Sequence, residues 1–175
     1  MADASGGTAA LAPPSPTALP PLAPLAVGKR LRLQGVGSAD PNENMVPLEI
    51  TVPPKFKLKM KGNEEQLPSA HLKGPGLEVV VEDPEAGFST LADLKGLISR
   101  GDPSATFIRV EETPDGFLLI YRATVAGIGP RFNAVVSRPG LKVDCGAYAL
   151  TQLSDAERAA SVCLSLRAAR GEPEN

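Results

Sequence analysis

The sequence predicts an α+β domain: an antiparallel sheet of about six to seven strands, two amphipathic helices packed on it, and a disordered Pro/Ala-rich N-terminal tail. Three observations predict this fold. Short segments that alternate apolar and polar residues between turn residues are typical of strands. Two longer segments repeat apolar residues at helical spacing. The chain has 175 residues, the size of one domain, and its hydrophobic content of 42% is enough for a core.

The domain organisation follows from changes in composition along the chain. Residues 1–26 consist mainly of Ala, Pro, Ser and Leu, and such a segment buries too little apolar surface to fold, so a disordered tail is expected. Residues 27–45 are a linker or contain a short first strand. Residues 46–171 are expected to form a single α+β domain, and residues 172–175 a C-terminal tail.

The first half of the domain is predicted to hold three strands. Residues 48–52 alternate cleanly and stop at two prolines, and residues 55–61 alternate lysine with apolar residues. Residues 64–76 contain two prolines and two glycines and are expected to be a loop. Residues 77–82 alternate again and form the third strand.

The second half is predicted to begin and end with a helix. Thr90 and Asp93 are spaced for an N-terminal cap, and Gly101 ends the first apolar stripe. Ser154 and Glu157 have the spacing of a capping box for the last helix, whose final turns would contain Arg167 and Arg170. Strands are expected between the helices at 106–111, 117–124, 131–138 and 141–145.

This order of elements resembles the PsbP-like fold superfamily, which includes bacterial DcrB-like proteins. The resemblance covers about residues 77–170 and depends on the order of helix, hairpin, two strands and helix, together with the pattern FxxLxxLKxxIS from Phe88 to Ser99. Members of this group are mostly binding or assembly proteins, among them secretion-effector chaperones. The resemblance therefore implies a chaperone-like or assembly role, without any active-site motif.

The main candidate binding residues are the lysines of the segment PKFKLKMKGN. Alternate residues of a strand project from one face about 6.6 Å apart, so a row of lysines can follow an acidic peptide. Lysines are also what natural sheets place on edge strands to prevent unwanted pairing, and the sequence favours this interpretation, a solvated strand face, over a binding surface. The candidate residues are Lys55, Lys57, Lys59 and Lys61.

A second candidate is a short apolar-basic segment after the tail. Lys29, Arg30 and Leu31 belong to VGKRLRL, which is either a first short strand or a docking peptide carried by the tail. The tail itself contains two PxxP spacings, which an aromatic groove of a partner can bind, but a proline-rich linker is the favoured explanation of them.

Catalytic and metal sites are not predicted. Cys145 and Cys163 are expected to point into one core as small apolar side chains, and they would form a disulfide only under oxidising conditions. His71 is the only histidine, and nothing in the sequence places it beside either cysteine. The spacing of these residues matches no zinc motif, so no metal and no cofactor are expected.

The sequence therefore favours a non-enzymatic, cytoplasmic adaptor or chaperone-like module that binds another protein. The 18 basic and 20 acidic residues nearly balance, which disfavours nucleic acid, and no run of 18 apolar residues predicts a membrane span. Two alternatives stay open. One is a small enzyme or ligand-binding domain whose site is not visible in the sequence, and the other is a structural subunit anchored by its N-terminal segment.

Overall fold

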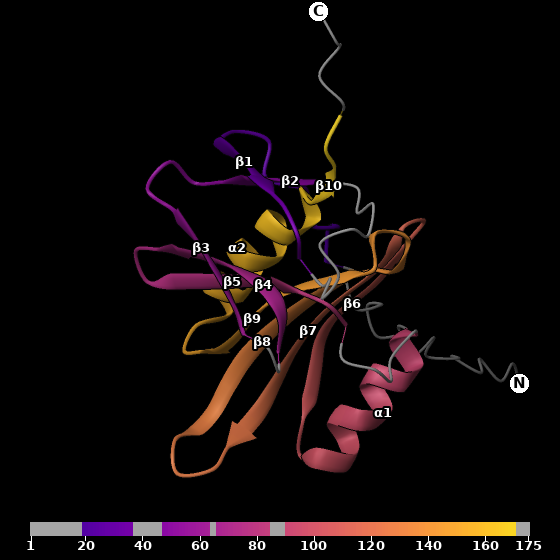
Figure 1. Cartoon of the computed structure of the whole chain (residues 1–175). Coiled ribbons are helices and arrows are strands. Elements are labelled where there is room, and N and C mark those ends of the chain that lie inside the picture. The colour runs from indigo at the N-terminus through magenta and orange to yellow at the C-terminus, as the bar shows by residue number, and fades with distance from the viewer. Residues whose placement is uncertain (1–18, 37–46, 64–65, 85–89, 171–175) are drawn as a thin grey trace, which may run out of the picture.

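The computed structural model describes residues 19–36, 47–63, 66–84 and 90–170 (Figure 1). The predicted tails therefore lie partly or wholly outside the described residues. The helices are α1 (Leu91–Gly101), η1 (Pro139–Leu141, a short 3₁₀ turn) and α2 (Leu153–Leu164). The strands are β1 (Lys29–Leu33), β2 (Leu48–Val52), β3 (Lys57–Asn63), β4 (Gln66–Gly74), β5 (Leu77–Glu82), β6 (Thr106–Thr113), β7 (Gly116–Val125), β8 (Gly129–Arg138), β9 (Val143–Leu150) and β10 (Arg167–Ala168).

The strands form two antiparallel sheets. The large sheet has seven strands in the order β3-β4-β5-β9-β8-β7-β6, and the small sheet has the order β1-β2-β10. The α+β class and the sheet of about seven strands are confirmed. The short strand within residues 27–45 is also present, as β1, but the sequence did not predict a separate small sheet.

The two helices lie on opposite faces of the large sheet. Helix α2 lies between the two sheets, where its alanines and Val162 join the main core with Ile50 of β2 and Ile120 of β7 (Figure 1). Helix α1 packs on the other face through Leu94, against Leu119 of β7. Strands β7 and β8 are therefore buried on both faces, whereas β5 is buried on one face only.

The predicted loop at residues 64–76 is wrong, because most of this segment forms strand β4. Proline lacks an amide hydrogen, so it is tolerated in a strand only at an edge or a bulge. The register between β3 and β4 shifts between Lys61 and Asn63, and Pro68 lies at this irregularity, before the part of β4 that pairs with β5. The proline therefore interrupts no ladder, and β4 forms.

The predicted cap of α1 is confirmed, and that of α2 is wrong. The Thr90 hydroxyl accepts a hydrogen bond from the Asp93 amide at 3.1 Å. Helix α2 begins after Gln152, which makes no side-chain cap bond, and Glu157 instead pairs with Arg109 at 3.4 Å. The capping box is absent because Ser154 is the second residue of the helix and not the residue before it.

The end of α2 also differs from the prediction. The helix stops at Leu164, and the hydroxyl of Ser165 accepts a hydrogen bond from the Thr51 amide of β2 at 2.9 Å. Pairing with β2 then draws Arg167 into β10, so this arginine lies in a strand and not in a final helical turn. Packing of the chain against the small sheet overrides the helical pattern.

Residues 19–26, the end of the predicted tail, lie against the domain. Leu22 and Leu25 are partly buried against the main core, and the Leu25 amide donates a hydrogen bond to the Ser161 carbonyl at 2.8 Å. Arg109 donates a hydrogen bond to the Pro20 carbonyl at 2.7 Å. The boundary of the predicted tail at residue 26 is therefore too late, because this segment contributes apolar side chains to the core.

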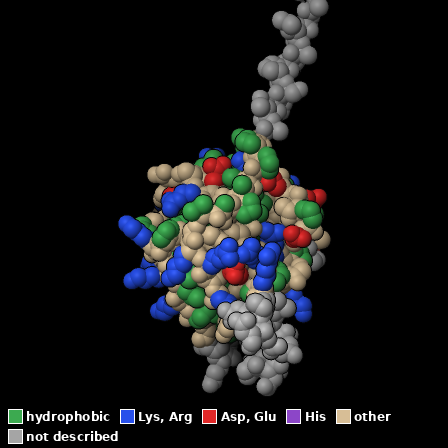
Figure 2. All heavy atoms as spheres, turned by 90° about the horizontal axis from the view of Figure 1, so that it is seen from above, with side chains coloured by type: hydrophobic (Ala, Val, Ile, Leu, Met, Phe, Trp, Pro, Cys, Tyr) green, Lys and Arg blue, Asp and Glu red, His purple; other side chains and the backbone are tan. Residues whose placement is uncertain are grey.

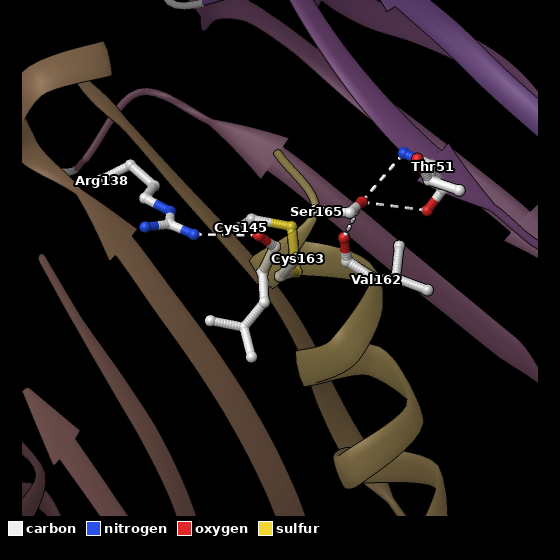
Figure 3. The surroundings of a disulfide bond; sticks show 7 residues. Thr51, Arg138, Cys145, Val162, Cys163 and Ser165 are labelled. Carbon is white, nitrogen blue, oxygen red and sulfur yellow. Dashed lines mark hydrogen bonds between the residues drawn. A yellow bond between two sulfur atoms is a disulfide. The ribbon is translucent and has the colours of Figure 1, made fainter. Parts of the chain in front are cut away.

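Cys145 of β9 and Cys163 of α2 form a disulfide, which the sequence left open (Figure 3). Both side chains are fully buried in the main core, as expected, with a Cα–Cα distance of 5.4 Å. The bond fastens the last turn of α2 to the middle of the large sheet. The segment that follows Cys163 therefore leaves the helix from a fixed point.

Candidate functional site

The predicted lysines lie along one free edge of the large sheet. Strand β3 is the end strand, and Lys57, Lys59 and Lys61 are exposed on it. Lys55 is exposed in the turn before the strand and not within it. We call β3 with these four lysines the lysine edge. A free edge strand leaves backbone amides and carbonyls without strand partners, and these groups can pair with another extended segment.

Phe56 fixes the start of the lysine edge. Its ring is buried, with 2% exposure, and a Cβ at Gly74 would overlap it. Glycine at position 74 therefore leaves the space in which the ring packs across the end of β4. Leu58 follows on the same face and is partly buried against the main core, so the alternate lysines point to the outer face.

One carboxylate partly neutralises the outer face of this edge. Glu78 of β5 accepts a hydrogen bond from His71 Nδ1 at 2.7 Å and lies 3.7 Å from Lys61 Nζ. The hydrogen bond with His71, and then the charge of Lys61, lower the pKa of Glu78, against the effect of burial. Glu78 is thus held in its charged form among these cations.

The described part of the structure gives the remaining lysines of the edge no acidic partner. Lys57 lies directly opposite Lys73 of β4, a like-charge pair that destabilises a sheet. Among the residues that the structure describes, Lys55, Lys57, Lys59 and Lys73 form no ion pair. The edge therefore carries an excess of positive charge that the described part of the fold does not balance.

The same outer face contains a buried acid, Asp144 of β9, with 7% exposure. Burial raises its pKa, and the charge of Asp83 adds to this effect, whereas a hydrogen bond from Ser137 lowers it. Atom Oδ1 of Asp144 has no hydrogen-bond partner among the described residues. Asp144 therefore binds its proton more tightly in the folded protein than in the unfolded chain. Ionisation of this carboxyl as the pH rises then lowers the stability of the folded protein.

We expect Asp144→Asn to raise the melting temperature at pH 7, because the amide cannot ionise. The difference from the unchanged protein should shrink as the pH falls and vanish near about pH 3, below the ordinary range of aspartate. Thermal unfolding followed by circular dichroism over this pH range measures it. A benefit that is the same at every pH would show that ionisation of Asp144 is not its cause.

The second candidate group, formed by Lys29, Arg30 and Leu31, is divided between the core and the surface. Leu31 of β1 packs against the main core, and Lys29 is exposed at the start of the strand. Arg30 joins a cluster around Glu49 of β2. Its Nε lies 3.9 Å from Glu49 Oε1, and Arg167 Nε donates a hydrogen bond to the same atom at 3.2 Å.

We call Arg30, Arg167 and Arg170 the arginine cluster. The hydrogen bond from Arg167 and the charges of all three arginines lower the pKa of Glu49. Figure 2 looks onto the side of the small sheet and shows Lys and Arg side chains gathered near its centre beside an acidic one. Three guanidinium groups against one carboxylate leave this surface basic.

A groove of about 1200 Å³ begins at the arginine cluster, two of whose members, Arg30 and Arg167, line it. Its other residues come from the end of the N-terminal segment, β2, the β6–β7 turn, the corner at η1, and the end of α2 with the chain that follows it. Arg138 stands in its wall, where it donates a hydrogen bond to the Leu164 carbonyl at 2.9 Å. The sequence missed Arg138 and Arg167 because only the tertiary fold brings these turns together.

The two cysteines and the histidine all have partners within the fold. Both cysteine sulfurs are in the disulfide, and His71 hydrogen-bonds with Ser69 and Glu78. Within the described ranges, no group of three or more His, Cys, Asp or Glu residues is arranged to hold a metal ion. In the same part of the chain, no helix is long and apolar enough to cross a membrane.

No protein-family model, curated protein or solved structure matches this chain. The resemblance of residues 77–170 to the PsbP-like superfamily therefore stays a prediction. The function has to be argued from the surfaces of this molecule alone.

Proposed function

We propose that the protein is a non-enzymatic binding module that pairs the lysine edge with an extended acidic segment of another protein. The observation that carries this proposal is a free edge strand whose positive charge the described residues do not balance. Strand addition uses backbone hydrogen bonds for affinity and alternate side chains for specificity. Here the incoming strand would place acidic side chains beside Lys57, Lys59 and Lys61.

The other face of the edge supports the same kind of partner. Met60, which alternates with the lysines along β3, is 40% exposed. A segment that alternates acidic and apolar residues would therefore meet lysines on one face and apolar side chains on the other. Edge lysines that serve only to prevent pairing explain the charge but do not need the exposed apolar side chain of Met60.

The test uses an end-blocked ten-residue peptide that alternates Glu and Val, titrated calorimetrically at two salt concentrations. Changing all four edge lysines to glutamine should weaken binding at least tenfold and reduce its salt dependence, since charge-assisted contacts contribute most of the specificity. The control removes four exposed cations elsewhere, and its affinity should stay close to that of the unchanged protein. These control positions are Lys29, Arg32, Arg100 and Arg122.

A second peptide separates strand addition from simple attraction of charge. It keeps the acidic residues and replaces the valines with proline, which has no amide hydrogen to complete a ladder. Equal affinity of both peptides would contradict pairing at the sheet edge, even if both depend on the lysines. Binding of the alternating peptide alone supports it.

The disulfide bears on where this module works. Disulfides persist in oxidising compartments and are rare in the cytosol. The cytoplasm stays the location that the sequence predicts, but the buried Cys145–Cys163 bond favours an oxidising compartment instead. We infer that the binding partner is met there.

A further inference from the structure

We propose that the groove beside the arginine cluster binds an anionic amphiphile, a ligand with a carboxylate or phosphate head and an alkyl chain. This site is separate from the lysine edge and does not depend on the proposed function. It would make the protein a carrier or sensor of such ligands as well as a binding module.

The wall of the groove is suited to an alkyl chain. Among its lining residues, ten have apolar side chains, and these come from four separate parts of the chain: Ala23, Pro24, Leu25, Ala26, Pro114, Pro139, Leu141, Leu164, Leu166 and Ala168. Ligand pockets are lined in this way, with a few polar groups that fix orientation. The volume of about 1200 Å³ is large for a compact ligand and leaves room for a long one.

The backbone of the groove favours such a chain over a peptide. The Leu25 and Leu166 amides donate to carbonyls of α2, and the Leu164 carbonyl accepts from Arg138. The Thr51 amide is bonded to the Ser165 hydroxyl. The three prolines of the wall have no amide hydrogen. A peptide would find few backbone partners at these positions, whereas an alkyl chain needs none.

The open end of the groove is suited to the anionic head. The side chains of Arg30 and Arg167 are 70% and 48% exposed, and both reach the same carboxylate, Glu49. Arg170 adds a third positive charge near it. Guanidinium groups recognise carboxylates and phosphates through paired hydrogen bonds, and here more donors are present than Glu49 can accept.

Arg138 is the third arginine of the groove lining, and its side chain is held by two partners. Arg138 is only 11% exposed and is fixed between the Leu164 carbonyl and Asp115, whose Oδ2 lies 3.6 Å from its Nη1. Figure 3 shows this arginine, Ser165 and the disulfide around the end of α2. The groove is therefore pre-formed, so a ligand does not have to order it.

The test is titration calorimetry with dodecanoate, dodecyl phosphate and the neutral dodecyl maltoside, each below its micelle concentration. Arg30→Gln with Arg167→Gln should weaken both anions at least tenfold, the loss expected when charge-assisted contacts are removed. Ala168→Trp should weaken the binding of both anions, because Ala168 is exposed and lines the groove, so the large ring occupies part of it without entering the core. Glutamine at the four lysines of the lysine edge is the matched control and should leave the affinity unchanged.

The two anions distinguish the source of the ligand. Tighter binding of dodecanoate indicates a fatty acid, tighter binding of dodecyl phosphate indicates a phosphate ester, and either result supports the proposal. Equal binding of dodecyl maltoside would overturn it, since the arginines would then have no role. Unchanged binding to the Ala168→Trp variant, or absence of binding by all three amphiphiles, would overturn it as well.

Discussion

Replacing Cys145 and Cys163 together with alanine should lower the free energy of unfolding by about 3 kcal/mol, the amount expected for a closed loop of this length. The two residues are 18 apart in sequence and join β9 to the last turn of α2. Without the bond, the unfolded chain gains freedom, and the buried site also loses the packing of the two sulfur atoms. Urea denaturation followed by circular dichroism measures the change.

The unchanged protein unfolded with and without a dithiol reductant provides the control. Reduction should reproduce most of the loss, because it breaks the same bond while both sulfur atoms remain. A loss below about 1 kcal/mol in the double variant would contradict a role of the bond in stability. The end of α2 would then be held mainly by the Ser165 hydrogen bonds and by the bond from Arg138 to the Leu164 carbonyl.

Gly74→Ala should destabilise the protein by about 2 kcal/mol, as expected for overpacking of a buried site. Position 74 has no positive φ, so the backbone accepts alanine. The cost arises because the added methyl group overlaps the buried ring of Phe56, which must leave its place. Since Phe56 directly precedes β3, the same change should also weaken peptide binding to the lysine edge.

Gly101→Ala is the matched control. A Cβ at this last residue of α1 meets no atom within 4 Å, and the change should stay within about 0.5 kcal/mol. Thermal unfolding of both variants and titration of the Glu/Val peptide measure the two effects. Equal stability of the two variants would show that Phe56 adapts without cost and does not fix the start of β3.

The elements predicted correctly are those in which local pattern and tertiary burial agree. Strand β5 alternates apolar residues and is buried on one face, so its pattern corresponds directly to its environment. The two strands of the β6–β7 hairpin, predicted at 106–111 and 117–124, likewise form and pair with each other. The cap of α1 needed only Thr90 and Asp93, both within one turn.

The errors arose where distant residues decide the local structure. Strand β4 forms in a segment with proline and glycine because β3 and β5 pair with it on both sides. The end of α2 is set by Thr51, which is 114 residues away from Ser165 in sequence. No periodicity within α2 contains this information.

The candidate sites show the same division. Alternation placed Lys57, Lys59 and Lys61 on one exposed face, and the strand confirms that placement. The groove needed Arg30 and Arg167 to meet at Glu49, and this depends on β1 and β10 pairing with opposite sides of β2. Strand order of this kind is not visible in a single sequence.

The burial of β7 and β8 on both faces has a consequence for how the molecule opens. Local unfolding is rarest where strands are covered on both sides and most frequent where contacts are few. We therefore expect the large sheet to unfold locally least often around β7 and β8 and more often at its edge strand β3. A partner that adds to β3 would act on the part of the fold that opens first, and it could be gained or lost without disturbing the groove.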